Sequence, residues 1–174
     1  MTPPPATSEA TRHSMQANKS KDTKPELKVR QALREAGLSG YRLHWKKAPG
    51  KPDVCYPGRR VAIFVNGCYW HRCPHCALPM PRHNVDFWEE KFARNQARDA
   101  RDQELLRAAG WTVVVIWECE LKGARFDSTM RSVVEIVRRA GAEGQARRRD
   151  GRVIHPAAAN GWHRREAWQR LSAR

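Results

Sequence analysis

The sequence predicts an α/β fold in which a mixed sheet is flanked by helices. Two observations support this prediction. The local patterns follow in the order helix, three strands, helix, strand, helix, which is typical of layered α/β domains. Two apolar, β-branched runs, Val61–Val65 and Trp111–Trp117, have the length and composition of buried strands. With 174 residues, the chain is long enough for one domain with a substantial core.

The first helix is expected to follow a polar N-terminal arm. Residues 1–12 are rich in Pro, Ser and Thr, a composition typical of disorder. Thr23 is a suitable N-cap, Pro25 is tolerated in the first turn, and Glu26 stands at the capping-box position. Gly37 is expected to end the helix. Helical spacing predicts an apolar stripe from Leu27, Arg30, Ala32, Leu33 and Ala36.

Three strands are predicted next. Tyr41–Trp45 alternates between polar and apolar residues, and Asp53–Tyr56 follows a Pro/Gly turn. Val61–Val65 is expected to be a central strand because it is apolar throughout.

Two further helices are predicted on either side of the last strand. The first is expected to begin at Asn84 or Asp86 and to end at Gly110. Its apolar residues are Phe87, Trp88, Phe92, Leu105 and Leu106, and its other face is basic. The last is expected to run from Ser128 to Gly141, with one apolar face made by Met130, Val133, Val134, Val137 and Ala140.

The charge of the chain points to a polyanionic partner. Lys and Arg outnumber Asp and Glu by 33 to 18, a net charge of +15, and the pI is about 10.4. Nucleic acid is the commonest partner of so basic a protein, although a solubilising surface is the alternative. Residues 142–174 form a basic tail, for which disorder is one interpretation. The sequence has neither an apolar run of about 18 residues nor a signal peptide, so we expect a cytoplasmic protein that contacts no membrane.

Four of the five cysteines are spaced like metal ligands. They are Cys68, Cys73, Cys76 and Cys119. Cys68 and Cys119 each follow a strong strand, and if these strands are neighbours the four sulfurs form a closed tetrahedral zinc site, which is structural. His75 is an alternative fourth ligand, and reduced thiols without a metal are the other interpretation. Cys55 is expected to be a small buried side chain.

Two residues near the predicted strand ends are candidates for catalysis. Asp53 follows Gly50-Lys51-Pro52 and starts a strand, and the next strand ends at Val65–Asn66. This is the layout of Pro-Asp nucleases, which hold Mg²⁺ through hard oxygen ligands, although a turn-capping role would also explain the aspartate. His71 lies among the cysteines but off their ligand spacing, so it is either a free general acid or base or a surface histidine.

Adjacent aromatic residues Tyr69 and Trp70 lie in the same polar loop. In a basic protein they suggest a wedge or stacking platform for bases, and packing beside the zinc is the alternative. Met15, a lone apolar residue in a polar stretch, is by itself more typical of a packing residue.

Five stretches together resemble one known family. They are Gly50-Lys51-Pro52-Asp53, Ile63-Phe64-Val65-Asn66-Gly67-Cys68-Tyr69-Trp70-His71, Phe87-Trp88-Glu89-Glu90-Lys91, Gly110-Trp111 and Trp117-Glu118-Cys119. In this order and spacing they resemble the very-short-patch repair (Vsr) DNA mismatch endonucleases, over residues from about 12 to 125. The resemblance implies a restriction-endonuclease-like (PD-(D/E)xK-type) fold with a structural zinc, formed by residues 13–141. It also implies a Mg²⁺-dependent nick 5′ of the T in a T:G mismatch that arises from 5-methylcytosine deamination, which initiates very short patch repair.

The resemblance also implies roles for individual residues. Asp53 would be the Mg²⁺ carboxylate and Val65 a second ligand through its backbone carbonyl. His71 would be the catalytic histidine and Glu26 the acidic partner near it. Asn66 departs from the pattern, because the best-known members carry a second histidine there. Asparagine can orient a water or a phosphate but cannot act as a base at neutral pH.

Recognition would use an intercalating wedge of Met15, Tyr69 and Trp70, which fits a T:G pair because a weakly stacked step is cheaper to open. The implied partner is double-stranded DNA with a T:G mismatch, bound by a nucleoid-associated monomer, with contacts to other mismatch-repair proteins as a further expectation. Two other functions remain open: a zinc-stabilised DNA-binding module without activity, and a nuclease of the same fold that cuts both strands or matched DNA.

Overall fold

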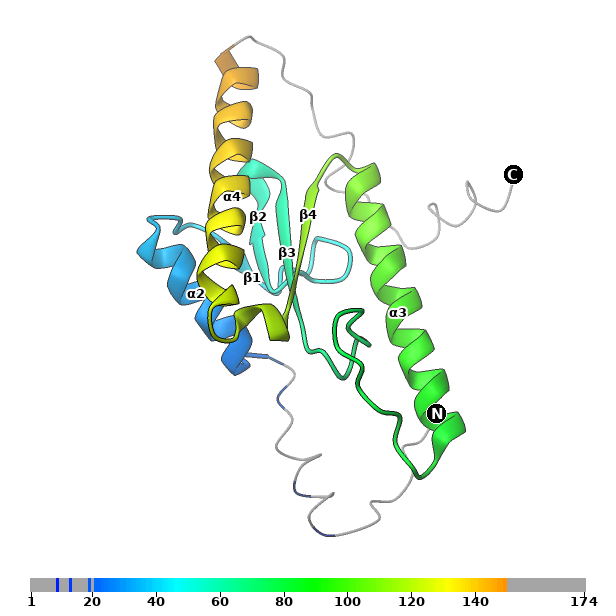
Figure 1. Cartoon of the computed structure of the whole chain (residues 1–174). Helices are drawn as coiled ribbons and strands as arrows, with labels where there is room; N and C mark the ends of the chain where they lie inside the picture. The colour runs from blue at the N-terminus through cyan, green and yellow to red at the C-terminus, as the bar shows by residue number, and fades with distance from the viewer. Residues whose placement is uncertain (1–8, 10–12, 14–18, 20, 150–174) are drawn as a thin grey trace, which may run out of the picture.

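The computed structural model describes residue 9, residue 13, residue 19 and residues 21–149. In this part of the chain, four strands form one mixed sheet with helices on both sides (Figure 1). The strands are β1 (Arg42–Leu43), β2 (Val54–Tyr56), β3 (Val61–Asn66) and β4 (Thr112–Trp117), and this is also their order in the sheet. The helices are α2 (Lys24–Glu35), α3 (Val85–Ala108) and α4 (Arg125–Arg149), with short 3₁₀ turns η1 (Pro57–Arg59) and η2 (Glu118–Leu121). The predicted mixed α/β fold is confirmed.

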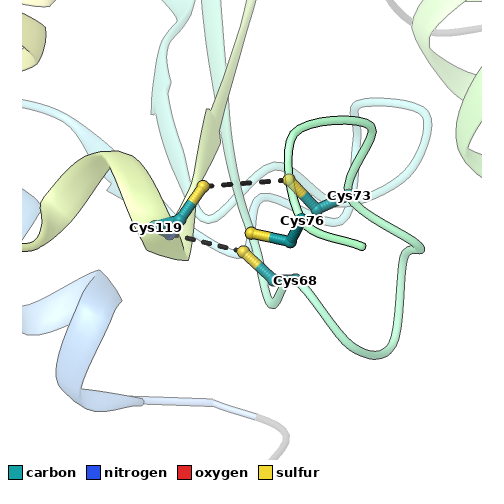
Figure 2. A group of neighbouring side chains, drawn as sticks. All are labelled: Cys68, Cys73, Cys76 and Cys119. Carbon is teal, nitrogen blue, oxygen red and sulfur yellow. Dashed lines mark hydrogen bonds between the residues drawn. The ribbon is translucent and has the colours of Figure 1, made fainter. Parts of the chain in front are cut away.

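The direction of the strands brings the candidate functional residues together at the C-terminal ends of β3 and β4. β1, β2 and β3 are antiparallel in turn, whereas β3 and β4 are parallel and joined through α3. The register pairs Asn66 with Trp117, so the C-terminal ends of the two parallel strands lie next to each other. The loop that carries Cys68 therefore meets the turn that carries Cys119 (Figure 2).

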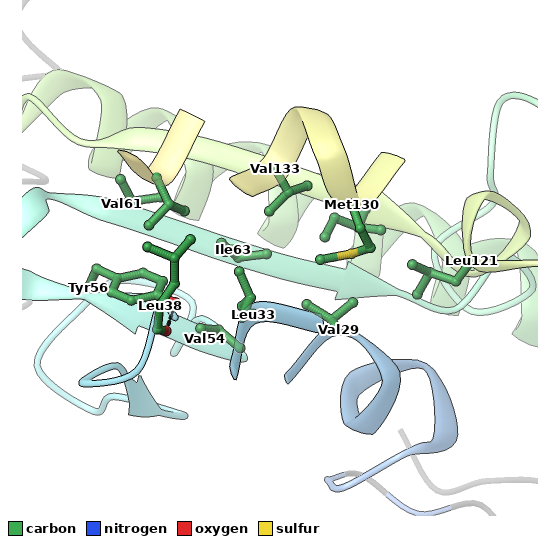
Figure 3. Close-up of a cluster of buried hydrophobic side chains, with 12 residues drawn as sticks. Val29, Leu33, Leu38, Val54, Tyr56, Val61, Ile63, Leu121, Met130 and Val133 are labelled. Atoms are coloured by element: carbon green, nitrogen blue, oxygen red, sulfur yellow. Dashed lines mark hydrogen bonds between the residues drawn. The ribbon is translucent and has the colours of Figure 1, made fainter. Parts of the chain in front are cut away.

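The main core lies between the sheet and the pair of helices α2 and α4 (Figure 3). Its buried residues are Val29, Leu33, Leu38, Val54, Tyr56, Val61, Ile63, Ile116, Leu121, Met130, Val133 and Val137. Strand residues alternate between the two faces, so Ala62 belongs instead to a smaller cluster with Leu106 of α3 on the opposite face. The sheet is thus covered by helices on both faces.

Helix α2 begins as predicted and buries most of the predicted stripe, with Leu27 as the exception. Thr23 is the N-cap and forms a reciprocal capping box with Glu26. The prediction that Leu27 belongs to the buried stripe was wrong, because its side chain is 49% exposed. Val29 is buried instead, together with Arg30. The inward face of α2 therefore carries a carboxylate and a guanidinium as well as apolar side chains.

Left-handed backbone conformations occur at two predicted boundaries: the first strand is shortened, whereas α3 begins after Asn84 as predicted. The first strand is only Arg42–Leu43, since His44 has a φ of 44° and cannot continue a strand. Asn84 is the N-cap of α3 but has a φ of 54° and makes no side-chain capping hydrogen bond. Asparagine tolerates this conformation better than most residues.

The prediction that the last helix spans Ser128 to Gly141 was wrong at both ends, because α4 runs from Arg125 to Arg149. A Cβ at Gly141 would lie 2.1 Å from Nη1 of Arg59, and this guanidinium donates a 3.0 Å hydrogen bond to the carbonyl of Val137. Glycine therefore makes room for an arginine here and does not end the helix.

Some expectations concern residues outside the described part of the chain. They include Met15, most of the arm at 1–12, and the tail from residue 150 onward. Among the described helices, none combines the length and apolarity that a membrane span requires.

Candidate metal centres and active site

Four cysteines converge beyond the C-terminal ends of β3 and β4 (Figure 2). The sulfurs of Cys68, Cys73, Cys76 and Cys119 all lie within 4.8 Å of one another. The sulfurs of Cys73 and Cys119 are 3.8 Å apart, far longer than a disulfide bond. Tetrahedral Zn–S bonds of about 2.3 Å place sulfurs about 3.8 Å apart. The residues therefore fit a closed four-thiolate metal site.

Burial raises the pKa of Cys68 and Cys119, but one backbone contact of the cluster favours a thiolate. The backbone N–H of Cys119 donates to the sulfur of Cys68 over 3.3 Å, a contact that stabilises negative charge on sulfur. Cys68 and Cys73 are buried, whereas His75 is exposed and is not part of the cluster. Cys55, expected to be buried, is fully buried in β2.

Asp53 stands directly before β2, which lies between β1 and β3, at the same end of the sheet. Its Oδ2 accepts a 2.7 Å hydrogen bond from the backbone N–H of Val65. Its Oδ1 lies 3.6 Å from Nδ1 of His44. Burial raises the pKa of Asp53 from 3.8 to about 6, an effect that the Val65 N–H opposes and the nearby Glu26 carboxylate reinforces. Burial thus disfavours the negative charge of Asp53, and a cation bound to the carboxylate would favour it.

Glu26 lies in a buried ionic network on the α2 side of Asp53. Its Oε2 accepts a 2.7 Å hydrogen bond from Arg30 and lies 3.5 Å from Nε2 of His44. Arg30 also pairs with Asp22. Hydrogen bonding to Arg30, although opposed by burial, lowers the pKa of Asp22.

The described contacts of His71 and Glu26 do not join them. Nδ1 of His71 contacts Oδ2 of Asp99, which extends from α3. Asp99 is therefore the acidic residue that contacts His71, and a role for Glu26 near His71 stays a prediction. Burial opposes ionisation of Asp99, but the imidazole of His71 and the guanidinium of Arg98 hold its pKa below the ordinary value.

No local sequence pattern identifies Asp99, because it lies 28 residues after His71. Only the packing of α3 brings its side chain to His71. The loop that carries His71 has a second contact with α3, in which Nδ2 of Asn95 donates to the carbonyl of Trp70 over 3.0 Å.

Asn66, at the end of β3, is 6% exposed. It therefore lies inside the sheet edge and not on the outer surface.

Tyr69 and Trp70 are part of an aromatic cluster with α3. Tyr69 meets Trp70 and Phe92 edge to face, with ring centroids 5.2 and 5.3 Å apart. Trp70 also packs against Trp88 at 6.1 Å, and Nζ of Lys91 lies over both indoles at 5.3 and 4.9 Å. Both Tyr69 and Trp70 stay partly exposed. They can thus present ring surface to a ligand while α3 supports them.

Comparison with known proteins gives consistent results. A family model described as DNA mismatch endonuclease Vsr matches residues 6–78. The chain is 39% identical to the type II nicking enzyme V.XorIIP of Xanthomonas oryzae pv. oryzae over 128 residues, which cover 73% of this chain and 93% of that protein. It is 38% identical to the DNA mismatch endonuclease Vsr of Escherichia coli over 111 residues, 63% of this chain and 70% of that protein. It is 41% identical to the type II nicking enzyme V.NmeAIP of Neisseria meningitidis over 105 residues, 59% and 73% of the two chains.

Fold and site thus define an α/β protein with a four-cysteine cluster that could hold a metal ion and a largely buried carboxylate at a strand start. With the comparisons, the class is that of the DNA endonucleases. The chain belongs to the Vsr family of DNA mismatch endonucleases.

Proposed function

We propose that this protein nicks one DNA strand 5′ of the T in a T:G mismatch that arises from 5-methylcytosine deamination, and so starts very short patch repair. The observation that carries the proposal is the set of side chains at the end of the sheet where β3 ends. There, the largely buried carboxylate of Asp53 accepts from the backbone of Val65 in β3, and the loop that follows β3 carries the His71–Asp99 contact and the partly exposed rings of Tyr69 and Trp70. The names of the relatives, a DNA mismatch endonuclease and type II nicking enzymes, support it.

Zinc is the metal we propose for the four cysteines. The S···S spacing supports a tetrahedral d¹⁰ ion, and four thiolates leave no open position for a water. Its role would be structural: it would tie the 68–76 loop to η2. Because His71 and the two aromatic residues lie in this loop, zinc would also fix their positions.

Mg²⁺ is the second proposed metal, held by Asp53 and the backbone carbonyl of Val65. Hard oxygen donors suit Mg²⁺, and the raised pKa of Asp53 supports a site made for added positive charge. When bound, Mg²⁺ would polarise the scissile phosphate and lower the pKa of an attacking water. The arrangement of Asp53 at a strand start, followed by an antiparallel strand, supports a restriction-endonuclease-like (PD-(D/E)xK-type) core.

The chain's own proton chemistry would rest on His71. Asp99 contacts Nδ1 and so orients the ring, which leaves Nε2 to exchange a proton with the reacting water or the leaving oxygen. Asn66 would orient a water or a phosphate oxygen through its amide. Glu26 would act on the other side of Asp53 by holding Arg30 and His44 in place.

Mismatch recognition would use the rings of Tyr69 and Trp70 as a wedge, with Met15 as the third member. The T-shaped contact of Tyr69 with Phe92 would restrict the motion of the Tyr69 ring. The ring would then stay in position to separate two stacked base pairs. The predicted partner is mismatched duplex DNA, bound by a monomer in the cytoplasm at the nucleoid.

The decisive test is a nicking assay on a labelled duplex with one T:G pair in a methyltransferase site, beside the matched duplex. We expect a single Mg²⁺-dependent cut 5′ of the T that the matched duplex lacks. Binding without a cut in every sequence context would favour an inactive binding module, and cleavage of matched DNA or of both strands would favour another nuclease role. Tyr69→Ala combined with Trp70→Ala should lower the preference for T:G over matched DNA. If the double variant keeps the parent's preference, the wedge proposal is wrong.

A further inference from the structure

The register of β1 and β2 explains why His44 lies beside the carboxylate of Asp53. β1 and β2 pair antiparallel, with Arg42 opposite Cys55 and Leu43 opposite Val54. The next positions along the two chains are His44 and Asp53. His44 does not continue the strand, because its φ of 44° is left-handed, a strained conformation for a residue other than glycine. Such strain commonly occurs at functional sites.

The contacts of His44 define which ring nitrogen carries the proton. Nη2 of Arg30 lies 3.2 Å from Nε2 of His44, and a guanidinium can only donate. Glu26 Oε2 lies farther from Nε2, at 3.5 Å, so we assign Nε2 as the acceptor from Arg30, which places the ring hydrogen on Nδ1. Nδ1 is the nitrogen that faces Oδ1 of Asp53, at 3.6 Å. Arg30 thus aims an N–H of His44 at the oxygen of Asp53 that the Val65 N–H does not bind.

Arg30 is held firmly enough to set this direction. The residue is 4% exposed, and its guanidinium donates to both Asp22 and Glu26. Asp22, Glu26 and His44 could by their spacing form a cation site. The Arg30 guanidinium already donates to all three, however, so we interpret the group as an arginine-centred network and not as a metal centre.

We propose that His44 is a positioning residue for Asp53: the chain Arg30–His44–Asp53 holds the carboxylate in the orientation in which it binds the catalytic cation. The inference rests on the proposed function, in which Asp53 is a cation ligand. It also gives the site a second imidazole. This one comes from the end of β1, whereas position 66, for which the family resemblance implies a histidine, is asparagine here.

The test compares two substitutions that both suit a left-handed backbone. His44→Gly removes the ring without backbone strain, and His44→Asn keeps an N–H donor at about the position of Nδ1. Cation binding is measured in the full-length zinc-loaded protein by Mn²⁺ titration, followed by electron paramagnetic resonance, on a T:G duplex with a non-hydrolysable phosphate at the cut site. Asp53→Asn is the reference for loss of the site, and His83→Ala, at an exposed histidine, is the matched control.

We expect His44→Gly to weaken Mn²⁺ binding about 10- to 100-fold, the usual effect of losing a residue that orients a metal ligand. His44→Asn should recover most of this loss, and His83→Ala should bind as the parent does. Mismatch affinity without the cation should change less than about twofold, and nicking by His44→Gly should recover at high Mg²⁺, which a merely structural defect would not allow.

Unchanged Mn²⁺ affinity in His44→Gly would overturn the inference, as would a His44→Asn variant that folds but binds no better than His44→Gly. Failure of the proposed function looks different: the parent would then bind Mn²⁺ no better than Asp53→Asn does, or would not nick T:G duplexes at all.

Discussion

Replacing Asp53 by asparagine is expected to abolish nicking but to stabilise the protein when Mg²⁺ is absent. The substitution keeps the shape of the side chain and an oxygen that can accept the 2.7 Å hydrogen bond from Val65. It removes a negative charge that lies largely buried beside the carboxylate of Glu26. A residue kept for catalysis is expected to cost stability in this way.

The size of the effect follows from the pKa. Burial raises the pKa of Asp53 from 3.8 to about 6, and one pH unit corresponds to about 1.4 kcal/mol. The ionised carboxylate therefore lowers the free energy of unfolding by up to about 3 kcal/mol at pH 7.5. The folded protein holds the proton of Asp53 more tightly than the unfolded chain does. The contribution of this proton to the free energy of unfolding is therefore fully present below pH 3.8. It is lost as the pH rises to about 6, and is constant above that.

The assay is urea unfolding of the parent and Asp53→Asn between pH 4.5 and pH 8, in Mg²⁺-free buffer without a chelator, so that the proposed zinc is not removed. The cysteine centre is common to both proteins, so its own pH dependence cancels in the difference. The advantage of the variant should grow with pH and level off near pH 7, and Mg²⁺ should reduce it by stabilising the parent alone. An equal or lower stability of the variant at pH 7.5 would refute the reasoning, since the Val65 hydrogen bond would then outweigh burial of the charge.

Three other predictions concern different parts of the molecule. Cys76→Ser should lose stoichiometric zinc by atomic absorption and unfold several kcal/mol more easily, as the parent should after chelation; retained zinc would favour His75 as the ligand. Asp99→Asn should lower kcat at least tenfold with little change in mismatch binding, because His71 loses its orienting charge; an unchanged kcat would exclude this role. Gly141→Ala should stabilise α4 by about 1 kcal/mol in thermal unfolding when Arg59→Ala has made room, and by less when the Arg59 guanidinium must shift; equal effects in both backgrounds would contradict the packing argument.

The sequence by itself determined those features that depend on neighbours a few residues away. The capping box of Thr23 and Glu26 is a local hydrogen-bond pattern, so it could be predicted from a spacing of three residues. The runs that became β3 and β4 were evident because both are apolar and rich in β-branched residues, although only β3 is mostly buried. The cysteine spacing predicted a four-sulfur cluster only on the condition that these strands are neighbours, and the observed register meets that condition.

Only the tertiary structure decided which distant side chains meet. Nothing within the loop shows that His71 contacts Asp99, because that pairing depends on how α3 packs across the sheet. The placement of His44 opposite Asp53 depends on the pairing of β1 with β2, and β1 is too short for its register to be predicted from a pattern. Gly141 has the sequence signal of a helix end, but its role is set by Arg59 from another element. Local propensity costs or gains about 1 kcal/mol per residue, so burial and ionic contacts between distant elements override it and decide the geometry of the site.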